Sequence, residues 1–412
     1  MDVSIVLPCL NEAQSLAVCI EAAREALDTL SERHGLGGEI LLADNGSTDG
    51  SQALAMRLGA RVVAVAERGY GAALRGGFTA ARGRFLVMGD ADGSYNFREA
   101  VPMVEALMAG ADLCMGSRFK GGIKPGAMPW KNRYIGNPLL TGVLNLLFRT
   151  GASDAHCGLR AITKACFERL ALTGSGMEFA SEMVIKAALK RQVIAEVPAT
   201  LSPDLRDRPP HLRPWRDGWR HLRYLLMLSP SWSFALPALV GGAAAATILT
   251  AATVAAVTDP GKPFFFGNYW VVLAGAMMSV SQISAILAAA THLYGVRAGY
   301  RPPKPWVVKL SRWLTLETML GTGALSIMLG LAVLAWAVVA WSGRGGGPNE
   351  SVLAVVLGTM FVALGAQNAL GGFLLAVVGG NEARFLEYGD LAEPTSDTSG
   401  KAAGQGPALA AR

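Results

Sequence analysis

Charged residues are scarce in this chain, and the scarcity is uneven. Asp, Glu, Lys and Arg make up 17% of its 412 residues, against about 25% in an ordinary soluble protein. Residues 1–230 carry charges throughout, whereas beyond Ser229 charges occur almost only in short loops and in the tail. This distribution excludes a uniformly soluble protein and indicates a soluble first half followed by an apolar second half.

Cysteines are also few, and their arrangement excludes two further classes of protein. The five cysteines, an odd number without any C-x-x-C pair, are Cys9, Cys19, Cys114, Cys157 and Cys166. Neither a disulfide framework nor a zinc site is expected, and we predict buried thiols in a reducing compartment. No basic run interleaves with aromatic residues, so nucleic acid is not an expected partner. The net charge of +6 suits a surface that lies next to anionic lipid.

The second half of the chain contains long apolar windows. Four of them are long enough to cross a bilayer, which takes about 20 apolar residues, and none contains Asp, Glu, Lys or Arg. The windows are Phe234–Val257, Phe264–Val296, Thr318–Trp341 and Ser351–Gly379. Buried helices of a large soluble core are the alternative, but four uncharged windows in succession favour a membrane domain of four transmembrane helices.

Basic residues in the loops predict the orientation in the membrane. The basic residues between the second and third windows are Arg297, Arg301, Lys304, Lys309 and Arg312, whereas the other two connections hold only Lys262 and Arg344. Positive charge stays on the cytoplasmic side, so we predict a multi-pass inner (cell) membrane protein with its soluble domain and C-terminus in the cytoplasm. The first residues, MDVSIVLPCLNE, lack the basic region of a signal peptide, as this orientation requires.

These patterns predict four segments. They are a soluble domain at 1–210, an amphipathic juxtamembrane helix at 211–230, a four-helix transmembrane domain at 231–381, and a cytoplasmic, largely disordered tail at 382–412. In the amphipathic segment, apolar residues at helical spacing face away from arginines; the residues are Trp215, Trp219, Leu222 and Leu226 against Arg216, Arg220 and Arg223. We expect this helix to lie in the membrane interface, and burial against the soluble domain is the alternative.

The soluble domain alternates short apolar runs with helical patterns. The runs are Val3–Leu7, Glu39–Ala43, Arg61–Val65, Phe85–Met88 and Leu113–Met115. Such alternation predicts an α/β domain with a mostly parallel sheet that helices cover on both faces. Ligands of these sheets bind beyond the carboxyl ends of the strands. Polar residues gather at those ends, in Pro8–Glu12, Asp44–Asp49, Glu67–Tyr70, Gly89–Tyr95 and Gly116–Arg118.

Two aspartates one residue apart, Asp90 and Asp92, follow the fourth run in LVMGDADGSYNF. Residues two apart in an extended segment project to the same side. Carboxylates suit Mg²⁺ or Mn²⁺, and substrate phosphates commonly complete such a site. An EF-hand is excluded because Tyr95 and Val101 stand at its sixth and twelfth positions. A turn rich in Asp and Gly is the alternative to a metal site.

Two neighbouring motifs fit a nucleotide ligand. LLADNGSTDG places Asp44 and Asn45 at a strand end, where their side chains can accept hydrogen bonds from a nucleobase or ribose. Ser47 or Thr48 in the same motif could simply cap the next helix. ERGYGAALRGG is not a dinucleotide fingerprint, because Leu74 replaces the third glycine. It still provides a glycine-flanked helix N-terminus, which is a favourable place for phosphate.

Six motifs in order resemble those of the family 2 glycosyltransferases: VLPCLNE, ADNGSTDG, ERGYGAALRGG, GDADGS, MGSRF and DAHCGLRA. The resemblance covers roughly residues 1–230 and is greatest to the branch that moves a sugar from a nucleotide onto a polyprenyl phosphate, such as dolichyl-phosphate mannose synthases and bactoprenol glucosyltransferases. It implies the GT-A nucleotide-sugar-binding fold, a nucleotide-sugar donor, a polyprenyl-phosphate acceptor, Mg²⁺ or Mn²⁺ as cofactor, and a role in the cell envelope.

Carried over residue by residue, the resemblance implies a donor site. Asp44 would contact the nucleoside, and Asp92, with Asp90 beside it, would hold the metal that bridges the diphosphate. The other implied donor-binding residues are Pro8, Asn11, Glu12, Asn45, Gly69, Tyr70 and Arg75. The family usually has a second aspartate where Asn45 stands, which weakens any role that needs a charge there.

The resemblance also implies an acceptor site. Arg118 in GSRF would meet the acceptor phosphate, helped by Arg133 or Lys131 in WKNRYIGN. The basic loop that follows EVP is longer here and richer in Arg and Pro. Its Arg206 and Arg208 are candidate diphosphate clamps, and a solvated loop that faces lipid head groups is the alternative. No Q-x-x-R-W sequence occurs, which argues against a processive polysaccharide synthase.

The chemistry of the acceptor separates the candidate functions. A phosphate monoester has its second pKa near 6, so it is already an anionic nucleophile at pH 7, whereas a lipid hydroxyl needs a general base. The candidate bases are Asp154 and Glu182, although Glu182 could instead pair with Lys186 one helical turn away. We expect His156 to have a structural role in its loop.

We therefore predict a metal-dependent inverting hexosyltransferase. Its donor would be of the UDP-glucose or GDP-mannose type, and its acceptor an undecaprenyl or dolichyl phosphate. A glycolipid synthase that acts on a membrane-lipid hydroxyl and a non-catalytic nucleotide-sugar-binding membrane protein are the alternatives. The sequence leaves the oligomeric state open, and a homo-oligomer is one option.

Overall fold

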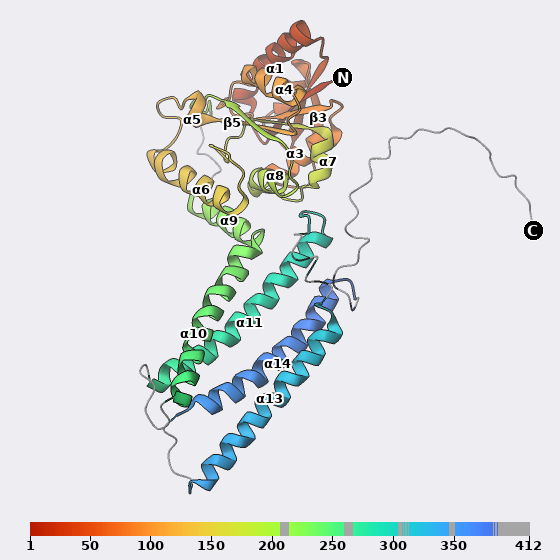
Figure 1. Ribbon diagram of the computed structural model, residues 1–412. Helices are drawn as coiled ribbons and strands as arrows, with labels where there is room; N and C mark the ends of the chain where they lie inside the picture. The colour runs from red at the N-terminus through yellow and green to blue at the C-terminus, as the bar shows by residue number, and fades with distance from the viewer. Residues whose placement is uncertain are drawn as a thin grey trace, which may run out of the picture.

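The computed structural model describes residues 1–206, 214–258, 267–303, 313–345 and 351–381, together with 307, 309, 311, 383 and 385. An α/β domain is followed by a helix along its lower side and then by a group of long helices (Figure 1). Four parts of the sequence predictions lie outside the described residues: Arg208, the connection with Lys262, the pair Lys304 and Arg312, and the tail beyond residue 385.

A seven-stranded sheet forms the centre of the α/β domain, with the strand order β3-β2-β1-β4-β6-β5-β7. The strands are β1 (Val3–Cys9), β2 (Gly38–Asp44), β3 (Arg61–Ala64), β4 (Phe85–Met88), β5 (Leu113–Ser117), β6 (Arg160–Thr163) and β7 (Ile194–Pro198). The five predicted strands are confirmed, and β6 and β7 are additions. All pairings are parallel except those of β6, which runs antiparallel to β4 and β5.

Helices cover both faces of this sheet, and the sheet separates two hydrophobic clusters. One cluster lies beneath α1 (Ala13–His34), α2 (Ser51–Arg57) and α4 (Ala100–Met108). The other lies beneath α3 (Tyr70–Ala80), α6 (Asn137–Phe148), α7 (Lys164–Leu170) and α8 (Glu178–Leu189). A short helix, α5 (Arg118–Gly121), follows β5 directly. This layered arrangement leaves the carboxyl ends of the parallel strands as the place where polar loops meet.

Four helices of the second half are long and apolar enough to cross a membrane. The spans are Ser231–Thr258, which contains α10 (Leu236–Thr258), and α11 (Gly267–Arg297), α13 (Leu316–Gly343) and α14 (Leu353–Val378). The prediction of four spans is confirmed, and the protein is a multi-pass membrane protein. Helices α13 and α14 approach closely at glycines: a Cβ on Gly330 would lie 2.6 Å from the carbonyl oxygen of Gly358. Small residues of this kind allow tight helix packing in lipid.

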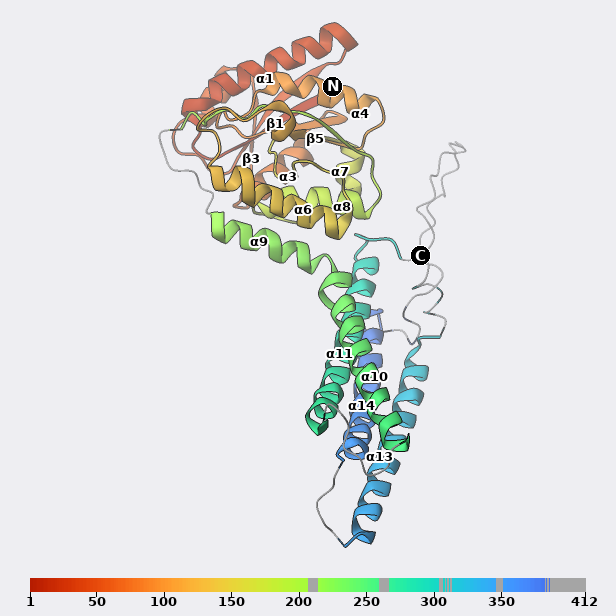
Figure 2. The ribbon, with the colours of Figure 1, turned by 60° about the vertical axis from the view of Figure 1, so that its left-hand side comes forward.

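The helix α9 (Pro214–Met227) joins the two halves and runs along the α/β domain beside α6 and α8 (Figure 2). Its Leu225 is 2% exposed and packs in the cluster beneath α8, and His221 is also buried. Trp219, by contrast, is 61% exposed, and Met227 is also exposed. Burial against the soluble domain therefore applies to one face of this amphipathic segment, and the location of its exposed apolar residues in the membrane interface stays a prediction. The side chains of Trp215, Arg216 and Arg220 lie outside the described part of the chain.

Candidate active site

The loops after the strands meet at one edge of the sheet, as the sequence predicts. After β1, the backbone N–H of Asn11 donates to Ser47 Oγ of the loop after β2 at 2.9 Å. At the start of α3, the Tyr70 hydroxyl donates to Asp90 Oδ1 of the loop after β4, also at 2.9 Å. Hydrogen bonds thus join loops that lie far apart in the sequence into one polar site.

Asp44, at the end of β2, shapes its own turn. Its buried carboxylate accepts hydrogen bonds from the backbone N–H groups of Gly46 (3.0 Å) and Ser47 (3.2 Å) and from Gln52 Nε2 (2.6 Å). Pro8, in the neighbouring strand β1, is buried and pairs with Ala43. The predicted nucleoside contact of Asp44 would therefore use a carboxylate that is already held in one orientation.

The side-chain amide of Asn45 joins the loop after β2 to the loop after β3, and both its nitrogen and its oxygen make hydrogen bonds. Nδ2 donates to the carbonyl oxygens of Val65 (3.0 Å) and Glu67 (2.7 Å), and Oδ1 accepts from the backbone N–H of Gly69 at 2.7 Å. A carboxylate has no N–H to donate to the two carbonyls. This arrangement gives a physical reason why the chain carries an asparagine, and not a second aspartate, at this position.

We expect Asn45→Asp to lower the free energy of unfolding of the α/β domain by about 2–3 kcal/mol, because two carbonyl groups lose their donor and face a charge instead. Thermal unfolding of the purified protein measures the change. Asn11→Asp is the matched control. Within the described residues the side chain of Asn11 acts through its oxygen, which accepts from the N–H of Thr48 at 2.7 Å and from the Thr48 hydroxyl at 3.4 Å, and a carboxylate accepts equally well. Equal destabilisation by both variants would contradict the stabilising role of the two hydrogen bonds that Asn45 Nδ2 donates.

Asp90 and Asp92 occupy different environments within the same turn. Burial, followed by the charge of Asp92, raises the pKa of Asp90 to about 7, while the hydrogen bond from Tyr70 opposes the shift. Asp92 is also buried; its Oδ1 accepts from the N–H of Ser94 at 2.9 Å, and its Oδ2 accepts from Arg206. The pair is therefore close enough to interact electrostatically, and a cationic group already lies on Asp92.

The guanidinium of Arg206 supplies the positive charge beside Asp92. Besides Asp92, its guanidinium contacts Glu12 Oε1 (3.3 Å) and Asp204 Oδ2 (3.2 Å). Among the residues that the structure describes, no three or more His, Cys, Asp or Glu side chains are grouped to hold a metal. The carboxylates here thus fit a divalent cation only as a partial ligand set, of the kind that phosphate oxygens complete.

The backbone places Arg206 over the aspartates. After β7, the chain runs along the turn that carries Asp92: the N–H of Ser202 donates to Ser94 O, and the N–H of Leu205 donates to Asp92 O, each at 2.9 Å. The predicted diphosphate clamp therefore lies at the carboxylates. Arg75, another predicted donor-site residue, instead pairs with Glu67 and donates to Thr173 O at 2.8 Å, contacts that tie α3 to its neighbours.

Arg118 is a buried arginine held by one carboxylate. Its Nε and Nη2 donate to Asp154 Oδ2 (2.6 Å) and Oδ1 (2.8 Å), and its backbone N–H donates to Oδ2 at 3.1 Å. Burial alone would raise the pKa of Asp154, but the Arg118 guanidinium holds it below its usual value. This bidentate pair leaves Nη1 of Arg118 without a recorded hydrogen bond in the described part of the chain. A further anion can therefore be bound there.

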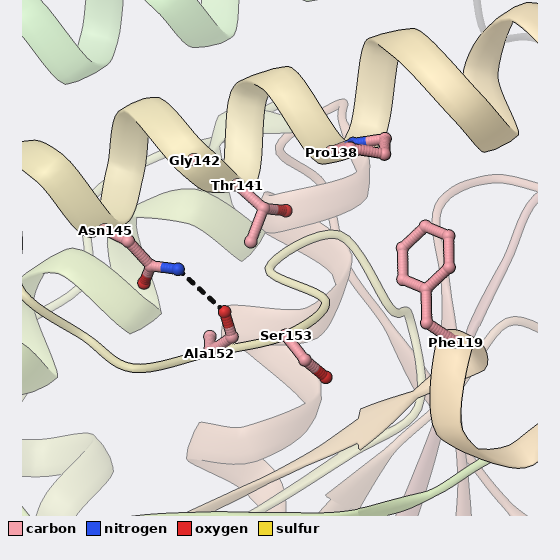
Figure 3. A pocket seen from close by; sticks show the side chains of 7 residues that line it. All are labelled: Phe119, Pro138, Thr141, Gly142, Asn145, Ala152 and Ser153. Atoms are coloured by element: carbon pink, nitrogen blue, oxygen red, sulfur yellow. Dashed lines mark hydrogen bonds between the residues drawn. The ribbon is translucent and has the colours of Figure 1, made fainter.

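An open groove of about 350 Å³ adjoins this pair (Figure 3). Phe119 and Ser153, each next in sequence to a member of the Arg118–Asp154 pair, face Pro138, Thr141 and Gly142 of α6 across it. The two predicted helpers of Arg118 lie on the segment before α6 and are exposed or half-exposed. Nζ of Lys131 lies 5.9 Å from the centroid of the Trp130 ring, and Cζ of Arg133 lies 5.4 Å from the centroid of the Tyr134 ring.

The carboxylate of Glu182, a candidate base, is fully enclosed. It accepts from Thr173 N–H (3.1 Å) and Gly174 N–H (2.7 Å), pairs with Lys186 Nζ at 2.7 Å, and accepts from the Tyr224 hydroxyl. The prediction that Glu182 could pair with Lys186 is confirmed. A buried carboxylate with these partners is not placed to take a proton from an acceptor.

Several residues of the site were not predicted from the sequence. Arg160, in DAHCGLRA, is completely buried and donates to three backbone carbonyls, of which Cys157 and Ala155 belong to the loop that carries Asp154. The sequence did contain a signal for this role, because an arginine beside apolar residues in a strand requires buried hydrogen-bond acceptors. The Arg118–Asp154 pair joins two quoted motifs, but nothing in their spacing indicates that they meet.

These features define a GT-A-like α/β domain joined to a helical membrane domain. A family model described as glycosyl transferase family 2 matches residues 4–171, and one described as the glycosyltransferase family 2 C-terminal transmembrane region matches residues 289–379. The low-salt glycan biosynthesis hexosyltransferase Agl6 of Haloferax volcanii is 32% identical over 377 residues, which cover 91% of this chain and 89% of that protein. The chain therefore belongs to the family 2 glycosyltransferases.

Two further similarities concern the α/β domain. The polyprenol monophosphomannose synthase of Mycolicibacterium smegmatis is 29% identical over 211 residues, covering 48% of this chain and 76% of that protein. The glucosyl-3-phosphoglycerate synthase of Mycobacterium tuberculosis, solved in complex with Mn²⁺, uridine diphosphate and glucosyl-3-phosphoglycerate, is 23% identical. Its TM-score is 0.40, with 55% of this chain and 78% of that chain covered.

Proposed function

We propose that this protein transfers a hexose, with inversion, from a nucleotide sugar of the UDP-glucose or GDP-mannose type to a polyprenyl phosphate. The observation that carries the proposal is that both candidate bases are ion-paired. Asp154 is bound by Arg118 and Glu182 by Lys186, so neither is free to activate a hydroxyl. A phosphate monoester needs no base, and the buried Arg118 is a suitable partner for it. The name of the mycobacterial synthase supports the same acceptor class.

In this mechanism the residues of the chain bind and orient the reactants. Asp44, Asn11 and Glu12 would shape the nucleoside pocket, and Asp92, with Asp90 beside it, would hold Mg²⁺ or Mn²⁺. The metal, when bound, neutralises the departing nucleotide diphosphate. Arg206 leaves Asp92 and contacts the diphosphate.

The acceptor side of the mechanism rests on Arg118. Its guanidinium holds the acceptor phosphate in line with the anomeric carbon, and positioning of this kind lowers the entropic part of the barrier. Lys131 and Arg133, which lie on the segment before α6, would assist by attracting the anionic head group from the membrane surface.

The acceptor panel that tests this proposal pairs a phosphate with the matching hydroxyl. Purified protein is incubated with Mn²⁺, a set of radiolabelled nucleotide sugars, and either undecaprenyl phosphate or undecaprenol. We expect label to appear in lipid only with the phosphate. Transfer to undecaprenol, or to diacylglycerol in a parallel incubation, with none to the phosphate, would replace the proposal by a lipid-hydroxyl glycosyltransferase.

We further propose that the α/β domain faces the cytoplasm of a cell whose inner membrane holds the four spans. The N-terminal domain, the loop after α11 and the C-terminus would then share one side, and the loop after α13 would lie opposite. Single cysteines introduced at residues 303 and 345 should therefore differ: an impermeant thiol reagent added to intact cells should label only position 345. Labelling of position 303 would overturn the orientation.

A further inference from the structure

The helix α9 contacts the α/β domain through polar and apolar side chains between His221 and Leu225. His221 Nδ1 lies 2.8 Å from Ser181 Oγ of α8, and the hydroxyl of Tyr224 donates to Glu182. Leu225, between these contacts and the membrane helices, is buried in the cluster beneath α8. Among the described side chains of the juxtamembrane helix, His221 and Tyr224 thus make polar contacts with two neighbouring residues of α8, Ser181 and Glu182.

His221 also contacts the loop that carries Asp154, on the proposed acceptor side of the site. The ring of His221 packs edge to face against the ring of His156, with centroids 5.3 Å apart and planes at 87°. His156 Nδ1 is buried and makes no hydrogen bond within the described part of the chain. The position of the His156 ring therefore depends on packing against its neighbours, and the ring of His221 is one of these neighbours.

His156 is linked in turn to the carboxylate that holds Arg118. The backbone N–H of His156 donates to Asp154 Oδ1 at 3.2 Å, and the same oxygen accepts from Arg118 Nη2 at 2.8 Å. Burial, followed by the charges of His221 and Arg118, lowers the pKa of His156 to about 3, so the ring is neutral at pH 7 and does not repel Arg118.

We propose that His221 is a positioning residue for the acceptor phosphate: its ring holds His156, and through His156 the Asp154–Arg118 pair. The inference rests on the proposed function, since it assumes that Arg118 binds the acceptor. It assigns the juxtamembrane helix a role beyond anchoring. Arg118 is correctly placed when α9 lies along the domain, so the acceptor site is completed by the segment that enters the membrane.

Two substitutions at one position separate the ring contact from the hydrogen bond. His221→Asn keeps a polar group for Ser181 but removes the ring, whereas His221→Phe keeps an aromatic edge against His156 but removes the hydrogen bond. With full-length protein, Mn²⁺ and undecaprenyl phosphate, we expect His221→Asn to raise the acceptor KM about 10-fold, because a displacement of about 1 Å costs up to about 10²-fold. The KM for the nucleotide sugar should change less than about twofold, and His221→Phe should restore most of the acceptor affinity.

Tyr224→Phe is the control for simple undocking of α9, because it removes the other polar contact without touching His156. We expect it to leave the acceptor KM within about twofold of the wild type. Equal increases in Tyr224→Phe and His221→Asn, or a wild-type acceptor KM in His221→Asn, would overturn the coupling. The wild-type protein serves as the separate test of the proposed function: if it transfers no sugar to undecaprenyl phosphate, that function is wrong, irrespective of the variants.

Discussion

Asp92→Ala should reduce sugar transfer by at least about 10³-fold while the α/β domain stays folded. Asp92 Oδ2 faces the guanidinium of Arg206, and in the proposed mechanism Asp92 would hold the metal. Without that metal the charge of the diphosphate would be left uncompensated. Removing a single electrostatic stabiliser of a developing charge costs about 10²–10³-fold, and loss of the metal adds to that cost. The measurement is initial-rate transfer at saturating Mn²⁺, together with Mn²⁺ binding by electron paramagnetic resonance in the presence of nucleoside diphosphate.

A neighbouring carboxylate provides the matched control. Asp204 also accepts a hydrogen bond from Arg206, at 3.2 Å, but it is half-exposed and precedes the arginine by two residues. Asp204→Ala should therefore retain both Mn²⁺ binding and most of the transfer rate. Full activity of Asp92→Ala in the presence of a chelator would contradict the metal role, and equal losses in the two variants would assign the effect to the position of Arg206 instead.

The second large effect concerns Arg118. Loss of a partly buried charge partner costs roughly 2–5 kcal/mol, so the KM for undecaprenyl phosphate should rise by about 30-fold or more when Arg118 is removed. Arg118→Ala alone leaves Asp154 as a buried, unpaired charge, and such a residue destabilises a fold by about 3–5 kcal/mol. The double variant Arg118→Ala/Asp154→Ala removes both charges, so it tests acceptor binding in a domain without that defect.

Two comparisons make this result interpretable. Lys131→Ala should raise the acceptor KM only a few-fold, because exposed charge pairs contribute less than about 1 kcal/mol. Glu182→Gln should retain much of the rate, since no proton has to be removed from a phosphate. A different result would contradict the proposal: Glu182→Gln abolishes transfer in a folded domain, while the Arg118 double variant is tolerated. The acceptor would then be a hydroxyl that needs a general base, and loss of that base lowers the rate by about 10²–10⁴-fold.

Periodicity and motif order predicted the elements that position the site. Five strands and four membrane spans were predicted because each contains a continuous apolar run, such as the one in Val3–Cys9, in which every residue is buried. The strand Arg160–Thr163 was not predicted, since only Ala161 and Ile162 of its four residues are apolar. Arg61–Ala64 is equally short and also begins with arginine, but its apolar run continues through Val65. Its antiparallel direction depends on pairing with β4 and β5, which no local pattern encodes.

The sequence predicted where the candidate site residues lie in the fold, but not which side chains they contact. The sequence placed Asp90, Asp92 and Arg118 after strand ends, and they lie there. It did not predict that Asp154 binds Arg118 across 36 residues or that Arg206 reaches Asp92 across 114 residues. Side-chain pairing over such separations is determined by how the loops pack. The same holds for the enclosure of Glu182 by Tyr224, which made a candidate base into a docking contact for α9.

The central claim is that the sugar is attached to a phosphate, and the lipid product tests it most directly. Undecaprenyl phosphate is incubated with the purified protein, Mn²⁺ and the nucleotide sugar that gives transfer, and the product is examined by mass spectrometry and phosphorus NMR. The account predicts a gain of one hexose and conversion of the phosphomonoester resonance to that of a phosphodiester. An unchanged phosphomonoester resonance, with the hexose gained instead by diacylglycerol added to the same incubation, would contradict it, because the sugar would then have been attached to a hydroxyl.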